Sequence, residues 1–153
     1  MSSNNGIKRI VVGVDGSGNS KAALQWVIRM AKGMGPQVTA VYGIGLPVYF
    51  PQPYGIPVQF DEEWRKEIKA EFEDKWCLPL RDAGLEYRTV MRDGRPASVI
   101  ADVADEEGAD LIVVGRRGRG GAAELLLGSV SHELALHSRK PVLLIEPEPA
   151  AKR

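Results

Sequence analysis

The sequence contains a single cysteine, Cys77, among 153 residues. A disulfide within the chain is therefore excluded, and such sparse use of cysteine is typical of proteins from a reducing compartment. We expect Cys77 to be packed on a helix. Only two histidines accompany it, and their spacing to the cysteine does not resemble a transition-metal site.

The sequence also has no excess of charge of either sign and no long apolar run. Twenty basic residues balance twenty acidic ones, whereas proteins dedicated to nucleic acids or membrane surfaces normally carry a basic excess. No apolar run approaches the ~18 residues that a membrane span needs. Residues 1–6 are polar and do not resemble a signal peptide. We therefore expect a cytoplasmic protein with no nucleic-acid or membrane partner.

What the sequence does have is the length of one domain and a surplus of glycine. A chain of this size can bury roughly 70% of its unfolded surface, which is enough for one core. We expect a single domain over residues 1–153, with its core at about residues 7–147. Glycine accounts for 17 of the 153 residues, above the usual ~7%. Five of these glycines lie within one short stretch: Gly115, Gly118, Gly120, Gly121 and Gly128.

Apolar patterns predict strands that alternate with helices. The predicted strands are 7–14, 38–44, 85–91, 111–114 and 142–145, and the predicted helices are 20–32, 61–83, 96–108 and 129–138. The first and fourth strands are continuously apolar at their centres, which is typical of strands buried on both faces. This alternation predicts βαβ units, and hence a doubly wound α/β domain with a five-stranded parallel sheet.

The segment 45–60 differs from the rest because it holds four prolines, with Tyr49, Phe50 and Tyr54 between them. Proline at that density is incompatible with a helix or a central strand, so we expect a loop. Packing, a lid over a ligand and a partner surface remain open as its role.

Glycine-rich segments follow two of the predicted strands. In parallel sheets of this kind, ligands bind at the carboxyl ends of the strands, where the strand order reverses. One such segment is Gly13–Ser17; the other is Gly115–Gly121, which also carries Arg116, Arg117 and Arg119. Backbone N–H groups of a glycine-rich loop can converge on a phosphate, and arginine adds positive charge. The two segments therefore predict an anion site.

The predicted helix at 129–138 adds further donors to this site. Unpaired N–H groups at the start of a helix carry partial positive charge and bind anions. We expect Ser129 and Ser131 to act both as caps of this helix and as hydroxyl donors to phosphate oxygens. A Walker A lysine, a G-x-G-x-x-G fingerprint and a G-x-S-x-G nucleophile elbow are all absent from the sequence. We identify no catalytic residue.

The spacing G-x-x-G-x(9)-G-S, formed by Gly115, Gly118, Gly128 and Ser129, resembles the nucleotide-binding motif of the universal stress protein family. The opening RIVVGVDGSGNSKAAL and the blocks ADLIVVGRRGRGG and LLLGSVSHELALHSRKPVLLIEP also resemble segments of that family. The resemblance extends over about residues 7–147. It implies a strand order of 3-2-1-4-5, a homodimer and, because the glycine motif is present, ATP binding.

The resemblance also implies which residues bind the nucleotide. Asp15 would lie at the ribose or near a Mg²⁺ or Mn²⁺ ion bound with the nucleotide, and the backbone of Gly43 would meet the adenine. The full set of implied nucleotide-binding residues is Gly13, Val14, Asp15, Gly43, Val114, Gly115, Arg116, Arg117, Gly118, Arg119, Gly120, Gly121, Gly128, Ser129, Val130 and Ser131. Two plainer readings stay open, in which Asp15 is a helix cap and the glycines form a flexible connection.

These observations favour an ATP-binding regulatory switch of the stress response. Three alternatives remain: a slow ATPase that uses Asp15, a metal ion and the arginines; a dimeric scaffold with a vestigial site; and a site for another adenine nucleotide such as cyclic AMP. The last predicted strand, Val142–Ile145, is strongly apolar and is an edge strand in the family order. Because exposed edges of this kind pair readily, we expect a homodimer through this strand and the following Glu146 and Pro147.

Overall fold

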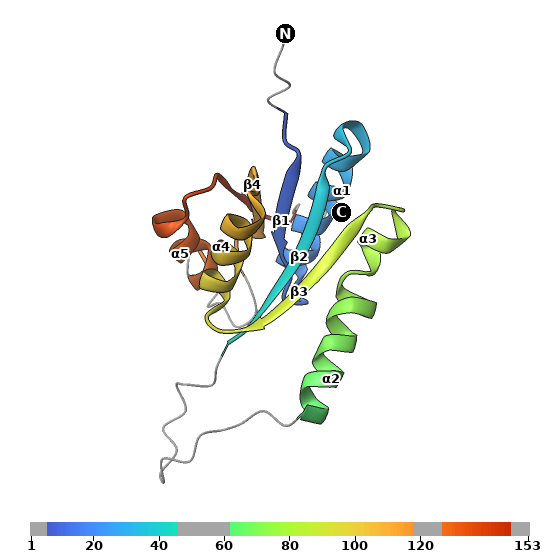
Figure 1. Ribbon diagram of the computed structural model, residues 1–153, viewed down its shortest axis with the longest axis vertical. Coiled ribbons are helices and arrows are strands. Elements are labelled where there is room, and N and C mark those ends of the chain that lie inside the picture. Colours follow the sequence, from blue (N-terminus) through green and yellow to red (C-terminus); the bar gives the residue numbers. More distant parts are fainter. Residues whose placement is uncertain (1–5, 46–61, 118–126, 148–153) are drawn as a thin grey trace, which may run out of the picture.

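The computed structural model describes residues 6–45, 62–117 and 127–147. Its five strands form one parallel sheet in the order β3-β2-β1-β4-β5 (Figure 1). The strands are β1 (Arg9–Gly13), β2 (Gln37–Ile44), β3 (Tyr87–Asp93), β4 (Leu111–Gly115) and β5 (Val142–Ile145). Both the fold class and the implied strand order are confirmed.

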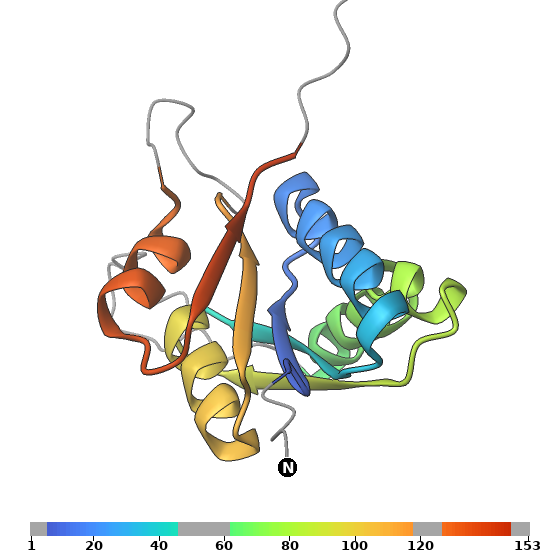
Figure 2. The ribbon, with the colours of Figure 1, turned by 90° about the horizontal axis from the view of Figure 1, so that it is seen from above.

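Helices cover both faces of this sheet. They are α1 (Gly18–Met34), α2 (Glu62–Ala70), the π-helical turn η1 (Glu71–Trp76), α3 (Leu78–Asp82), α4 (Pro96–Glu107) and α5 (Ser129–His137). Helix α1 lies on one face together with the segment from α2 to α3, and α4 and α5 lie on the other (Figure 2). None of the helices in the described ranges has the length and apolar character needed to span a membrane.

The side chains of successive residues in the central strands point to opposite faces of the sheet. In β1, Ile10 and Val12 belong to the core beneath α1, whereas Val11 between them belongs to the core beneath α4. All three are almost completely buried. A strand segment buried on both faces has no polar positions, which explains why β1 and β4 are continuously apolar at their centres.

The prediction of one continuous helix over 61–83 is wrong. The N–H group of Cys77 donates to the carbonyl of Phe72 at 3.0 Å, which is a five-residue π-type turn. The cause lies two residues further on, because Pro79 has no N–H group and its ring would strike the carbonyl of Lys75 in a regular helix. The chain therefore widens at η1 and restarts as α3.

The apolar stripe of this segment belongs to the core only in part. Phe72 and Leu80 are fully buried, whereas Trp64, Ile68 and Trp76 are partly exposed. Helix α2 has no fully buried residue, and Arg65 joins it to the end of β3 through a bidentate ion pair with Asp93. Cys77 is buried here, as expected.

The register between β1 and β4 is fixed at their amino ends. The Asp110 carboxylate accepts hydrogen bonds from the backbone N–H groups of Lys8 at 2.8 Å and Arg9 at 3.0 Å. These two bonds hold the pKa of Asp110 below its ordinary value. With Ile10 paired to Leu111, the carboxyl ends of the two strands reach the same edge of the sheet.

Candidate functional site

The chain turns in opposite directions where the neighbouring strands β1 and β4 end. The chain leaves β1 for α1 on one face of the sheet, and after β4 it reaches α5 on the other face (Figure 2). The strand order reverses between these neighbours, and the carboxyl edge at such a reversal is where open α/β sheets bind ligands. The described parts of both glycine-rich segments, Gly13–Ser17 and Gly115–Arg117, lie here.

The turn after β1 is shaped by Asp15. Its Oδ1 accepts a hydrogen bond from the N–H group of Ser17 at 2.9 Å, and the Ser17 hydroxyl in turn accepts from the N–H group of Ser20 at 3.2 Å. Ser17 is therefore the N-cap of α1, which excludes the reading of Asp15 as the cap. Gly16 has a φ of 80°, a backbone conformation that favours glycine.

Gly115 at the end of β4 is enclosed by the first turns of two helices. A Cβ atom built on Gly115 would lie 2.6 Å from the backbone carbon and from the Cβ of Asn19 in α1. From α5, the buried Ser131 hydroxyl donates to the Gly115 carbonyl at 2.8 Å. The amino ends of α1 and α5, which both carry partial positive charge, therefore meet at one point of the sheet edge.

We expect Gly115→Ala to lower the free energy of unfolding by about 2 kcal/mol, because the new methyl group must displace the backbone of Asn19. Urea unfolding measures the change. Gly33→Ala is the control, since a Cβ atom there meets nothing within 4 Å, and we expect that variant to be at least as stable as the parent. Equal midpoints for Gly115→Ala and the parent would contradict the close approach.

The start of α5 is tied to the end of β4 by the backbone. The N–H group of Gly128 donates to the carbonyl of Arg116 at 2.8 Å, and Gly128 is the N-cap residue, without a side-chain cap. The expectation that a serine caps this helix is therefore wrong. The first bond of the helix joins the N–H group of His132 to the Gly128 carbonyl at 2.9 Å. The N–H groups of residues 129–131 precede it and are those that a helix offers to an anion.

Arg116 and Arg117 lie beside this helix start and share one carboxylate. Arg116 Nη1 is 2.6 Å from Glu146 Oε2, and Arg117 Nη2 is 3.8 Å from Glu146 Oε1. The two arginine side chains are 26% and 30% exposed. Four further site residues of the sequence prediction lie outside the described residues: Gly118, Arg119, Gly120 and Gly121.

Three of the predicted glycine and valine positions have packing reasons of their own. A Cβ atom on Gly43 would lie 2.7 Å from the Cα of Pro96 at the start of α4, and one on Gly13 would lie 2.8 Å from Ile100. Val114 is buried against the same helix. Gly13–Asp15, Gly115–Arg117 and residues 128–131 thus gather at one edge, whereas Gly43 lies on β2, on the far side of β1 from β4.

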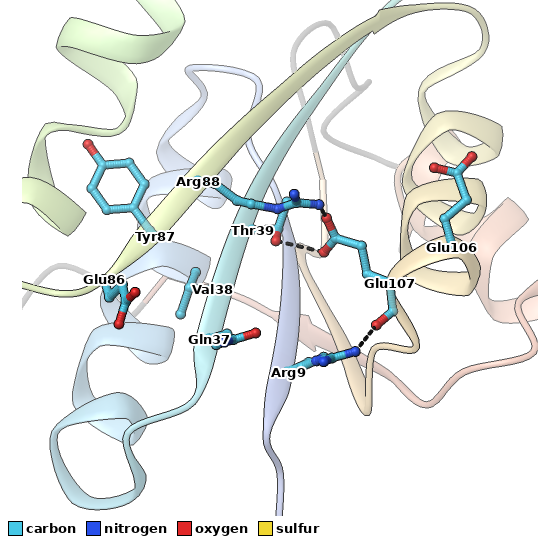
Figure 3. A pocket seen from close by; sticks show the side chains of 9 residues that line it. All are labelled: Arg9, Gln37, Val38, Thr39, Glu86, Tyr87, Arg88, Glu106 and Glu107. Carbon is cyan, nitrogen blue, oxygen red and sulfur yellow. Dashed lines mark hydrogen bonds and ion pairs between the residues drawn. The ribbon is translucent and has the colours of Figure 1, made fainter.

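A hollow of about 380 Å³ lies at the opposite, amino edge of the sheet (Figure 3). In it, the Glu107 carboxylate accepts from the Thr39 hydroxyl at 2.7 Å and pairs with Arg88, while Arg9 donates to the Glu107 carbonyl at 2.7 Å. Cations at the carboxyl end of a helix offset its partial negative charge. These groups hold the end of α4 against the sheet, a role that no pattern in the sequence indicates.

No group of three or more His, Cys, Asp or Glu side chains that could hold a metal ion occurs among the residues that the structure describes. Asp15 is the residue that the sequence prediction offers to a metal ion at this site, and it supplies one carboxylate. Mg²⁺ bound with nucleotides commonly takes one or two protein carboxylates together with phosphate oxygens and water, and one carboxylate is compatible with that arrangement.

This fold and this edge of the sheet define a small α/β protein of the universal stress type. Residues 6–146 match the model of the universal stress protein family, and the chain belongs to this family. Universal stress protein YxiE of Bacillus subtilis is 33% identical over 144 residues, which cover 90% of this chain and 97% of that protein.

Solved structures agree with this assignment. The structure of MJ0577 from Methanocaldococcus jannaschii has a TM-score of 0.76 and 25% sequence identity, and the match covers 94% of this chain and 99% of that one. A universal stress protein in complex with cAMP has a TM-score of 0.67 and 26% identity over 91% of this chain and 97% of its own. A universal stress protein from Archaeoglobus fulgidus in complex with dAMP has a TM-score of 0.66 and 25% identity over 90% and 96%.

Proposed function

We propose that this protein binds ATP at the carboxyl edge of β1 and β4 and acts as a regulatory switch of the stress response. The observation that carries the proposal is the enclosure of Gly115 by the first turns of α1 and α5. Two helix starts and two arginines at one point favour a ligand with several negative charges. Similar proteins in complex with cAMP and dAMP support an adenine nucleotide.

Each group at this edge of the sheet has a role in the proposal. The N–H groups of residues 129–131 and the guanidinium groups of Arg116 and Arg117 bind phosphate oxygens. Asp15 accepts from a ribose hydroxyl or binds a Mg²⁺ or Mn²⁺ ion that accompanies the phosphates, and such an ion would neutralise phosphate charge. The buried Ser131 hydroxyl is committed to the Gly115 carbonyl, so it holds the helix start in place and leaves phosphate contacts to the backbone.

The direct test of the proposal is calorimetry with ATP, ADP, AMP and cyclic AMP. Cyclic AMP is the second candidate ligand because a similar structure contains it. If the arginines and the helix start bind a polyphosphate, affinity should rise from AMP to ATP. A preference for cyclic AMP over ATP would identify cyclic AMP as the ligand instead of ATP. The absence of binding by all four nucleotides would contradict the proposal.

We also propose a homodimer that pairs through β5. This strand is the edge of the sheet, and all four of its residues, Val142–Ile145, are apolar and only partly buried. An apolar edge of this kind is a pairing liability unless another chain covers it. We expect sedimentation at micromolar concentration to give the mass of a dimer, and a stable monomer would contradict this assembly.

A cytoplasmic location completes the proposal. It is supported by the single cysteine, Cys77, which is buried and unpaired. Burial raises the pKa of this thiol to about 12, so it remains protonated and poorly reactive at neutral pH.

A further inference from the structure

Glu146 follows the edge strand β5 and places its carboxylate against both described arginines of the predicted phosphate loop. Its Oε2 lies 2.6 Å from Arg116 Nη1 and its Oε1 lies 3.8 Å from Arg117 Nη2. The backbone fixes this arrangement, because the N–H group of Arg116 donates to the carbonyl of Ile145 at 2.8 Å. The acid and the arginines are therefore neighbours through the sheet itself.

A carboxylate and a phosphate are alternative partners for a guanidinium group. Both present oxygens that accept two parallel hydrogen bonds from its fork. The Arg116 carbonyl accepts the N–H group of Gly128, the N-cap of α5, at 2.8 Å. Arg116 therefore pairs with Glu146 through its side chain, and its backbone carbonyl is hydrogen-bonded to the helix start that would bind phosphate.

We propose that Glu146 occupies the arginines in place of a phosphate and so sets how strongly the site prefers ATP to nucleotides with fewer phosphates. This inference rests on the proposed nucleotide site. A ligand that engages Arg116 or Arg117 through its phosphates must first separate them from Glu146. A ligand without phosphate, such as adenosine, leaves the pairs intact and is indifferent to Glu146.

The free energy of these ion pairs is small enough to allow such an exchange. The Glu146 side chain is 54% exposed, and exposed pairs contribute no more than about 1 kcal/mol. They are therefore strong enough to reduce phosphate affinity and weak enough to be displaced. Glu106 of α4 offers a matched control, because it is 55% exposed and pairs through two hydrogen bonds with Arg92 of β3, outside the candidate nucleotide site.

Calorimetry with ATP and adenosine on the parent, Glu146→Gln and Glu106→Gln tests the inference. Glu146→Gln should bind ATP about two- to fivefold more tightly, which is the range that exposed ion pairs give. Its affinity for adenosine should be unchanged, and Glu106→Gln should match the parent for both ligands. An equal gain in ATP affinity from Glu106→Gln would assign the effect to net charge and overturn the inference.

A double-mutant comparison separates competition for the arginines from plain repulsion of phosphate by Glu146. In the Arg116→Gln/Arg117→Gln background, Glu146→Gln should no longer raise ATP affinity. The same gain in that background would overturn the inference. Parent and Glu146→Gln proteins that bind ATP equally well would also overturn it while the proposed function stands. If no variant binds ATP or adenosine, the proposed function itself fails.

Discussion

Replacing Gly128 with glutamate should weaken ATP binding by at least about 100-fold, or ~2.8 kcal/mol, and leave the fold in place. Gly128 is the N-cap of α5, and its side-chain position borders the N–H groups that precede the first bond of the helix. A longer side chain fills the space where phosphate approaches the backbone, and its charge repels phosphate. Its φ of −69° and ψ of 163° are open to any residue, so we expect no backbone strain.

Calorimetry measures this loss, and circular dichroism with urea unfolding establishes that the variant is folded. Gly33→Glu is the matched control because it makes the same change of charge at a position where a Cβ atom meets nothing within 4 Å. Gly33 lies near the other end of α1, and this variant should bind ATP like the parent. Undiminished ATP affinity in a folded Gly128→Glu protein would show that the site lies elsewhere.

Purified protein should hydrolyse ATP far more slowly than the ~10 s⁻¹ that is typical of enzymes. The described groups of the candidate site are the N–H groups at the start of α5, the two arginines that pair with Glu146, and Asp15. Asp15 accepts a hydrogen bond from the Ser17 N–H group. Groups that hold ATP and its transition state equally well give affinity without rate. The measurement is phosphate release in the presence of Mg²⁺ or Mn²⁺.

ATP should nevertheless raise the melting temperature of the protein, because a ligand that binds only the folded state stabilises it. Asp15→Ala should reduce this thermal shift by removing a ribose or metal contact. Asp15→Asn is the companion variant, since an amide oxygen can still accept the Ser17 N–H group and keep the turn. If the protein hydrolysed ATP near ordinary enzyme rates and Asp15→Ala abolished that activity, the protein would be a hydrolase and not a switch.

The sheet was predictable because its central strands have a simple physical signature. β1 and β4 are buried on both faces, so their sequences are continuously apolar. β3 alternates in polarity, and the structure places it at an edge of the sheet. The path from 62 to 82 was not predictable in the same way. The apolar stripe continues through it, whereas the break depends on where the ring of Pro79 meets the preceding turn.

The gathering of the candidate site segments at one edge of the sheet was predictable, whereas the contacts between those segments were not. Glycine patterns placed the segments at the ends of β1 and β4, because the topology of a parallel sheet brings those ends together. The bond from Ser131 to the Gly115 carbonyl and the pairing of Glu146 with Arg116 join residues that are 16 and 30 positions apart. No local pattern encodes such contacts, since they arise from the packing of whole elements.

Gly43 and Gly115 show a second limit of prediction from the sequence. The family pattern assigns them to the nucleotide, and the structure supplies a packing reason for each in the close approach of Pro96 and Asn19. A glycine in a sequence does not distinguish contact with a ligand from contact with a helix. Only the position of the neighbouring backbone does.

Titration of the isotope-labelled protein with ATP, followed by the amide resonances, tests the nucleotide site most directly. The account predicts that the largest shifts fall on Gly13–Asp15, Gly115–Arg117 and residues 128–131, which gather at the carboxyl edge of β1 and β4. The amides around Thr39 and Glu107, in the hollow at the opposite edge, should not move. Shifts confined to that hollow, or no shifts at ATP concentrations in the millimolar range typical of ~4 kcal/mol of binding, would contradict it.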